Sequence, residues 1–269
     1  TISIIGNGVV VDPWALLDEI KEISSKGIEI TPKNLIISDS ANLILPFHRE
    51  MDEIREDAAG KAKIGTTRRG IGPAYEDRVG RRAIRLCDIF DKKILKKKIE
   101  NALFHHNPIR KGLGIKEIQS DEIIKQLDEI TSFVKPFVTN VWEKLINLQN
   151  QNKNILYEGA QGVLLDVDHG TYPFVTSSNT VSAQSSIGSG VGYIRKSYTL
   201  GIAKAYLTRV GEGPFPTEQN NAIGEKLGII GNEFGAVTGR KRRCGWLDLV
   251  LLKQAVNISG IDGIALTKL

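Results

Sequence analysis

Cysteine is scarce in this sequence: only Cys87 and Cys244 occur among 269 residues, far apart in the chain. We therefore expect neither a disulfide framework nor a cysteine-based metal site, and a reducing cytoplasm fits. Long apolar runs are missing too, since the longest is Leu249–Leu252, against the ~18 residues that a membrane span needs. The first residues carry no basic group of the kind that opens a signal peptide. Neither a membrane protein nor a secreted one is expected.

Aromatic residues make up only 6% of the chain, although its net charge is +5 and its isoelectric point about 9.1. Residues 61–98 hold thirteen Lys/Arg and four Asp/Glu, a local net charge of +9. Because the whole chain carries +5, the remaining residues carry a net charge of −4. One basic zone on a mildly acidic body favours a local anion site over a long nucleic-acid groove. Nucleic-acid binding typically interleaves aromatic rings with cations, and the arginine-rich segment offers only Tyr75. For Lys92–Lys98 a solvated helix face is an equally good interpretation.

Hydrophobic periodicity predicts strands alternating with helices. Residues 1–11 are expected to form a short strand, a Gly-Asn-Gly turn at 6–8 and then the apolar run Val9–Val11. Further strands are expected at 35–37, 154–158, 200–210 and 263–267. Helices are expected at 12–27, 41–59, 89–104, 120–149 and 246–258, the fourth kinked or divided at Pro136. Residues 64–80 show no period and are expected to be loop. The alternation indicates an α/β fold with a largely parallel sheet and a helical section at about 87–150. Ligands of such sheets bind at the carboxyl ends of the strands.

Several common catalytic motifs are missing. The sequence has no Gly-x-x-x-x-Gly-Lys-Ser/Thr phosphate loop and no Gly-x-Ser-x-Gly elbow. Gly188–Gly192 matches half of a dinucleotide fingerprint, but no predicted strand precedes it. His105 and His106 have no carboxylate at metal-ligand spacing, so a surface or capping role is preferred.

Asp166, Asp168 and His169 form a tight group after the Gly159–Gly162 loop. These side chains are suited to holding a metal ion or to acting as acid and base. They are equally suited to bracing a loop through hydrogen bonds, which is the interpretation that we favour.

Glycine is concentrated towards the C-terminus, where residues 159–245 hold 15 of the 27. Glycine lets backbone amides approach an anionic ligand, although an isolated glycine more often marks an ordinary turn. Three glycine-bearing segments also carry hydroxyl, amide or guanidinium groups suited to phosphates and carboxylates. They are Ile64–Arg82, Glu158–Asn179 and Gly231–Asp248.

These three segments, with Thr208–Thr217 and Leu266–Leu269, resemble the adenylosuccinate synthetase family along the whole chain. The resemblance implies an α/β fold whose mostly parallel central sheet is flanked by helices, like that of P-loop GTPases, in a single catalytic domain. It implies a cytoplasmic homodimeric ligase of purine biosynthesis, without nucleic-acid or membrane partners. Such an enzyme joins L-aspartate to inosine monophosphate (IMP), giving adenylosuccinate, the first committed step from IMP to AMP. GTP is the co-substrate and Mg²⁺ the cofactor.

The sequence departs from the family pattern at both ends. Family members open with a Gly-Asp-Glu-Gly-Lys-Gly-Lys phosphate loop, whose Asp is the catalytic base and a magnesium ligand, and a His that acts as acid follows. Neither occurs here, and the family's guanine-recognising Asp would follow Leu269. The first residue is Thr1 and the only methionine is Met51. We therefore expect residues 1–269 to be an internal fragment, incomplete at both ends, inactive alone and with the magnesium ligands elsewhere.

The resemblance also implies roles for individual residues. Gln161 matches the glutamine that hydrogen-bonds the hypoxanthine, a task that suits an amide because it both donates and accepts. Arg81 matches an arginine that reaches the 5′-phosphate from the partner subunit. The expected IMP-binding residues are Thr67, Arg81, Gln161, Thr176, Val210 and Arg240. The expected aspartate-binding residues are Val237, Thr238, Gly239, Arg240 and Arg242. The expected GTP contacts are Arg242 and Lys268.

Two alternatives to this enzyme remain open. A basic nucleic-acid-binding protein is the first, because of the charge excess in residues 61–98. A non-catalytic relative that kept the fold but lost the reaction is the second, because the phosphate loop is absent from this sequence.

Overall fold

A computed structural model describes residues 1–60, 65–192, 197–235 and 239–269. The chain divides into two compact units. The first unit comprises Thr1–Met51, Gly70–Leu156 and Ser186–Gly192, and the second comprises Asp52–Arg69, Tyr157–Ser185 and Tyr193–Leu269. A single catalytic domain over residues 1–269 stays a prediction, and the helical section at 87–150 lies within the first unit. Among the described helices, none combines the length and the apolar character that crossing a bilayer requires.

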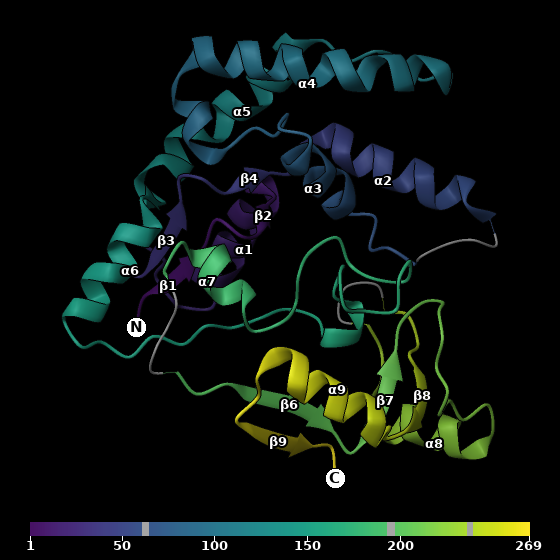
Figure 1. The fold of residues 1–269 in the computed structure, drawn as a ribbon. Coiled ribbons are helices and arrows are strands. Elements are labelled where there is room, and N and C mark those ends of the chain that lie inside the picture. Colours follow the sequence, from purple (N-terminus) through teal and green to yellow (C-terminus); the bar gives the residue numbers. More distant parts are fainter. Residues whose placement is uncertain (61–64, 193–196, 236–238) are drawn as a thin grey trace. The chain divides into compact units, whose positions relative to one another are not determined.

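A parallel three-stranded sheet organises the first unit (Figure 1). Strand β3 (Leu35–Ser38) lies between β1 (Ser3–Ile5) and β5 (Val138–Thr139), and both pairings are parallel. Every residue of β3 is buried, as expected for a parallel strand covered on both faces. A second parallel pair joins β2 (Val10–Val11) to β4 (Asn42–Leu43). The parallel α/β class is thus confirmed.

Helices supply most of the rest of the first unit. They are α1 (Pro13–Ser25), α2 (Pro46–Ala58), α3 (Ile71–Val79), η2 (Leu86–Phe90), α4 (Lys92–Gly112), α5 (Ser120–Val134), η3 (Lys135–Phe137), α6 (Val141–Asn150) and α7 (Gln184–Ser189), of which α2 and α7 continue into the second unit. The loop predicted for residues 64–80 is wrong where α3 forms. The pattern missed α3 because the helix is short and glycine-bearing. Pro73 in its first turn was a usable signal.

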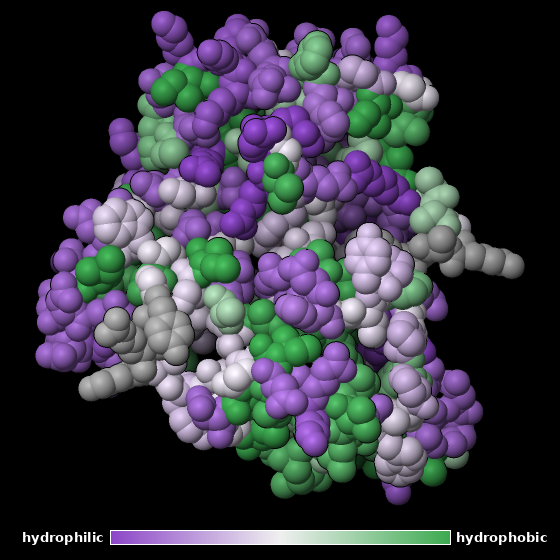
Figure 2. Space-filling model, viewed as in Figure 1, coloured by the Kyte–Doolittle hydropathy of each residue, from purple (hydrophilic) through white to green (hydrophobic). Residues whose placement is uncertain are grey.

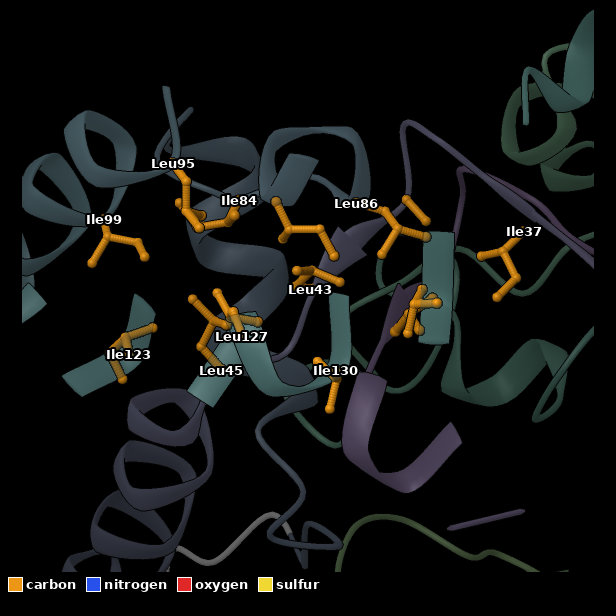
Figure 3. Packing of buried hydrophobic residues seen from close by; sticks show 14 of the residues in the cluster. Ile37, Leu43, Leu45, Ile84, Leu86, Leu95, Ile99, Ile123, Leu127 and Ile130 are labelled. Carbon is orange, nitrogen blue, oxygen red and sulfur yellow. The ribbon is translucent and has the colours of Figure 1, made fainter. Parts of the chain in front are cut away.

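The core of the first unit joins β-strand residues to helices α4 and α5. Leu43 of β4 and Leu45, two residues after it, belong to one buried cluster with Leu95 of α4 and Leu127 of α5 (Figure 3). The predicted break at Pro136 is confirmed, because α5 ends at Val134 and Pro136 lies in η3. The helical section therefore packs through apolar faces that the 3.6-residue period had identified.

The second unit contains two separate strand pairs. Strands β6 (Leu200–Lys204) and β9 (Gly263–Thr267) pair in parallel, whereas β7 (Tyr206–Arg209) and β8 (Arg243–Trp246) pair antiparallel. Helices η4 (Val163–Leu165), α8 (Ala222–Ile230) and α9 (Leu249–Ser259) complete it. The single strand predicted at 200–210 is therefore two strands with different partners.

Apolar side chains are exposed on the second unit, over α9 and the β6–β9 pair (Figure 2). Leu249 and Val250 of α9 are 67% and 78% exposed, and Ile202 of β6 is 69% exposed. The strand predicted at 154–158 is wrong: these residues form no ladder, and Leu156 is 91% exposed. A strand needs a neighbour to pair its backbone groups, and no described residue supplies one there.

Candidate functional site

The expected ligand-binding residues fall in both units. Arg81 belongs to the first unit. The second contains Thr67, Gln161, Thr176, Val210, Gly239, Arg240, Arg242 and Lys268. Val237 and Thr238, both expected to bind aspartate, lie outside the described residues.

Gln161 and Thr176 lie on loop segments that are bonded to each other. Gln161 is exposed and has a φ of 61°, a conformation that residues other than glycine rarely adopt. The Thr180 hydroxyl donates to the carbonyl of Gly162 at 2.9 Å, and the Thr176 amide donates to the carbonyl of Leu165 at 2.8 Å. The loop after Gly162 therefore holds Gln161 and Thr176 within one hydrogen-bonded assembly.

Asp166 lies at the centre of this assembly and is fully buried. Its carboxylate accepts hydrogen bonds from the amides of Asp168, His169 and Thr180 at 3.0, 3.1 and 2.5 Å. Burial alone would raise the pKa of Asp166, but these backbone hydrogen bonds outweigh it and hold the pKa below its usual range. The bracing interpretation is confirmed for Asp166, because its oxygens are engaged by the loop itself.

The segment before Thr67 touches two other parts of the expected IMP site. Gly65 has a φ of +88°, and a Cβ placed on it would lie 3.0 Å from Nη1 of Arg240 and 3.1 Å from Cα of Gly211. The Gly65 amide donates to Glu56 Oε1 at 2.7 Å, which fixes the segment on α2. Thr67, Val210 and Arg240 therefore come from segments that lie side by side.

Arg209 joins the Val210 segment to the Thr176 segment. Its Nη2 donates to the Thr171 hydroxyl at 2.8 Å and to the carbonyl of Phe174 at 3.0 Å. Its Nε donates to the carbonyl of Glu212 at 2.8 Å. Five of the six expected IMP residues thus belong to segments linked within the second unit.

Arg242 and Lys268 meet at a buried carboxylate that sequence reasoning missed. Nη1 of Arg242 lies 2.8 Å from Oε2 of Glu233, and Nζ of Lys268 lies 3.6 Å from Oε1. Burial would raise the pKa of Glu233, but hydrogen bonds from Lys204, Tyr206 and Arg242 outweigh it and lower that pKa to about 2. An acidic residue shortly before the four-cation run at 240–243 was the available signal.

Arg81 lines a surface hollow of the first unit, together with other arginines and a lysine. The hollow measures about 210 Å³ and is lined by Asn42, Arg78, Arg81, Arg82, Ala83, Arg85, Lys98 and Asn101. Arg78 donates to the carbonyl of Gly8 at 3.0 Å, and Lys98 pairs with Asp88 at 2.7 Å. Arg81 is exposed and has a φ of 60°. An anion is the ligand that such a surface attracts.

The surface or capping role expected for the His105–His106 pair is wrong for His106, which is 3% exposed. Its Nε2 lies 2.7 Å from Oδ2 of Asp77, and Nε2 of His48 lies 3.0 Å from the same oxygen. Sequence spacing hid the cluster because α2, α3 and α4 each supply one member.

The His48–Asp77–His106 cluster does not suit a magnesium ion. The Leu45 amide donates to Nδ1 of His48 at 2.9 Å, so a neutral His48 carries its proton on Nε2 and donates it to Asp77. Arg82 Nε also donates to Asp77 at 3.0 Å. Magnesium prefers oxygen ligands, whereas two of these three groups are imidazoles. The cluster is a buried hydrogen-bonded brace.

Comparisons with known proteins agree with this geometry. The family model for adenylosuccinate synthetase matches residues 1–269. The fully ligated adenylosuccinate synthetase of Plasmodium falciparum superposes with a TM-score of 0.90 at 35% identity, covering 100% of this chain and 62% of that one. The chain thus spans less than two thirds of that enzyme's length.

A more distant solved structure shares the fold. It is the succinoaminodeoxyadenylate synthetase of cyanophage S-2L, bound to dGMP and to dATP as an energy donor. It superposes with a TM-score of 0.65 at 22% identity and covers 98% of this chain and 64% of that one. Since the family model matches every residue, the chain belongs to the adenylosuccinate synthetase family.

Proposed function

We propose that a protein containing this chain joins L-aspartate to IMP at the expense of GTP, giving adenylosuccinate. The observation that carries the proposal is the linkage of the Thr67, Gln161, Thr176, Val210 and Arg240 segments within one unit. Those segments present a hydroxyl, an amide and a guanidinium group, which match the phosphate and hypoxanthine of a purine nucleotide.

In the proposed reaction the γ-phosphoryl group of GTP moves to oxygen 6 of the hypoxanthine, and GDP leaves. The amine of aspartate then attacks carbon 6, and inorganic phosphate leaves with the former oxygen 6. Such transfers depend mainly on positioning and on charge stabilisation. Gln161 would orient the ring, Thr67 and Thr176 would hold the 5′-phosphate, and Arg81 would reach that phosphate from the partner subunit.

The aspartate and GTP sites use the segment around Arg240 and Arg242. A guanidinium group pairs with a carboxylate through two parallel hydrogen bonds, so each arginine is suited to one end of the amino acid. Arg240 would serve aspartate and IMP, Arg242 aspartate and GTP, and Lys268 the guanine. Val237, Thr238 and Gly239 complete the proposed aspartate loop.

Magnesium belongs to the same proposal. When bound, the ion neutralises charge on the transferring phosphoryl group. The described His48–Asp77–His106 cluster does not suit it, so we propose that its ligands lie outside these residues. A polypeptide limited to residues 1–269 is then expected to be inactive, and turnover by it would show that the phosphate-binding groups are misplaced. A homodimer in the cytoplasm, acting in purine biosynthesis, fits the family.

The direct test is an assay of the complete purified protein that contains residues 1–269, with IMP, aspartate, GTP and Mg²⁺. Formation of adenylosuccinate that requires all three substrates supports the proposal. A folded protein without turnover, but with tight and steeply salt-dependent polynucleotide binding, would favour the nucleic-acid alternative. A folded protein that binds IMP and GTP without turnover would indicate a non-catalytic relative.

A further inference from the structure

Glu233 lies where the two parallel strands of the second unit end. Lys204 is the last residue of β6, and it lies opposite Thr267, the last residue of β9. Lys268 follows directly. Glu233 itself comes after α8 and is 0% exposed. A single buried carboxylate therefore faces the carboxyl ends of both strands, which is the edge where α/β sheets bind ligands.

Three cations and a phenol share this carboxylate. Nζ of Lys204 lies 2.9 Å from Oε1 and 2.8 Å from Oε2, and Nη1 of Arg242 lies 2.8 Å from Oε2. The Tyr206 hydroxyl donates to Oε1 at 2.6 Å, and Nζ of Lys268 lies 3.6 Å from the same oxygen. One negative charge faces three positive ones, so the cluster keeps a net positive charge beside the proposed aspartate and GTP sites.

The backbone ties the same two residues together. The Arg242 amide donates to the carbonyl of Glu233 at 2.9 Å, and Phe234 forms an antiparallel bridge with Lys241. Beyond the bridge, the Gly235 amide donates to the carbonyl of Arg240 at 2.8 Å. Glu233 and Arg242 therefore face each other at the base of the segment that carries Gly239 and Arg240.

Gly231, at the end of α8, packs closely against the cluster. A Cβ placed on Gly231 would overlap the Tyr206 hydroxyl and would lie 3.2 Å from Cγ of Glu233. Lys268 donates to the carbonyl of Gly231, which holds its ammonium group at the same place. Glycine at position 231 therefore lets the end of α8 approach Tyr206 and the Glu233 side chain closely.

We propose that Glu233 is a positioning residue for the aspartate and GTP sites, an inference that rests on the proposed function. It holds Arg242 by one guanidinium nitrogen and leaves the other nitrogens, which have no hydrogen-bond partner among the described residues, for a ligand carboxylate or phosphate. It also keeps Lys204, Arg242 and Lys268 together, since three cations without it would repel one another.

The test compares Glu233→Gln and Glu233→Asp with the wild-type enzyme. Glu233→Gln keeps the shape but loses the charge, so Arg242 and Lys268 are released. We expect the KM for aspartate to rise about tenfold or more and the KM for GTP to rise as well, with the KM for IMP and kcat changing less than about threefold. Glu233→Asp keeps the charge and should restore part of both KM values.

A matched control is the neighbouring pair of Glu218 and Arg243. Nε of Arg243 donates to Glu218 Oε1 at 2.7 Å. Glu218→Gln therefore also breaks a carboxylate–arginine pair, at the residue that follows Arg242 and begins β8. This variant should leave the KM for aspartate near the wild-type value. If Glu218→Gln and Glu233→Gln have the same kinetic effect, Glu233 has only a structural role and the inference is overturned.

Stability and binding measurements keep the two proposals separate. If Glu233→Gln does not fold, two other variants are compared with the wild type instead. Glu233→Asp shortens the carboxylate side chain, and Gly231→Ala crowds it. Turnover by the wild-type protein tests the proposed function. The ratio of the variant's KM values for aspartate and GTP to those of the wild type tests the role of Glu233. If the wild-type protein makes no adenylosuccinate, equilibrium GTP binding still tests the role of Glu233. Weaker GTP binding by Glu233→Gln than by the wild type supports the positioning role, and unchanged binding refutes it.

Discussion

At the scale of single residues, Gln161 combines an exposed amide with a left-handed backbone at a φ of 61°. A free loop would relax that conformation in a residue with a Cβ. Here the loop is braced by Asp166 and by the Thr180–Gly162 bond. The backbone that carries the Gln161 side chain is thus held in place, which suits the proposed hydrogen bonding to a purine ring.

Gln161→Ala should lower kcat more than it weakens GTP binding. One lost hydrogen bond to the reacting ring in a closed site costs about 3 kcal/mol, roughly a hundredfold in rate. Steady-state kinetics with each substrate varied in turn measures this. Gln151→Ala, at an exposed position after α6, is the control and should keep wild-type rates. A wild-type kcat in Gln161→Ala would remove Gln161 from the site.

Arg240→Leu and Arg242→Leu should both raise the KM for aspartate, because leucine cannot make the paired hydrogen bonds of a guanidinium group. Arg242→Leu should also raise the KM for GTP, whereas Arg240→Leu should instead raise the KM for IMP. Lys241→Leu, an exposed neighbour, serves as the control. An unchanged aspartate KM in both arginine variants would show that the carboxylates bind elsewhere.

At the scale of elements, local signals predicted those that local chemistry determines. Asp12 caps α1 by accepting from the Ala15 amide at 3.1 Å, and Pro13 opens the helix. Both features were readable in the sequence. The strand expected at 154–158 depended instead on a pairing partner, and the described chain provides none. β-Propensity alone therefore gave a wrong result there.

The site followed the same rule. Gln161 and Arg242 became candidates because the long motifs around them resemble the family, and their roles stay predictions. Asp77 was missed because His106 lies 29 positions from it. Glu233 has Arg242 only nine positions away, but its other partners, Lys204 and Tyr206, lie 29 and 27 positions away. No periodicity or spacing rule reports a contact that only the folded chain creates.

Asp166→Asn should loosen the loop that carries Thr176 and Thr180. The asparagine replaces one acceptor oxygen by a donor, which faces backbone amides that already donate. Such a mismatch typically costs about 1–3 kcal/mol. We expect a higher KM for IMP and faster amide hydrogen exchange in residues 163–181. Asp168→Asn, at an exposed position, should have a smaller effect, and equal effects of the two variants would contradict the central place of Asp166.

At the scale of the whole molecule, the positive charge has two different roles. Lys92 and Lys96 of α4 pair with Asp128 and Asp121 of α5 at 2.7 and 3.4 Å. This part of the basic zone is an exposed helix face whose ion pairs contribute little stability. The arginines around the hollow at Arg81 instead converge on one place. The local anion site expected from composition therefore stays a prediction, for which the arginines around the hollow and Lys98 are the candidates, rather than Lys92 and Lys96.

Arg81 should act on the partner subunit's site in the proposed dimer. Arg81→Leu and Gln161→Ala subunits would each be inactive as homodimers. Random mixing gives heterodimers with one intact site, so activity should return to about one quarter of the wild-type level. The mixture is assayed after heterodimers have been quantified by differently tagged chains. Heterodimers without activity would show that Arg81 does not work across the interface.

The stability of the protein should fall as the pH falls. Burial lowers the pKa of His48 below its ordinary value, and Asp77 offsets this only in part. Below about pH 6.5 the unfolded chain therefore binds a proton that the folded chain does not. The pKa of Glu233 is lowered to about 2. The ionised Glu233 therefore stabilises the folded protein at pH values above the ordinary carboxyl pKa, and this stabilisation is lost as the pH falls towards 2.

Urea denaturation at about pH 7, 5.5 and 4 measures this dependence. The free energy of unfolding should decrease across the series, and His48→Gln should flatten the first step. His169→Gln, at an exposed position, should leave the profile as it is. Stability that is constant or rises towards pH 5.5 would contradict the neutral, buried state of His48.

The most direct test of the proposed reaction follows one oxygen atom. IMP labelled with ¹⁸O at position 6 is incubated with the complete protein that contains residues 1–269, with aspartate, GTP and Mg²⁺, and the inorganic phosphate is analysed by mass spectrometry. Transfer of the γ-phosphoryl group to oxygen 6, followed by displacement by the aspartate amine, predicts one ¹⁸O in each phosphate released with adenylosuccinate. Adenylosuccinate formed with unlabelled phosphate, or phosphate released without adenylosuccinate, would contradict it.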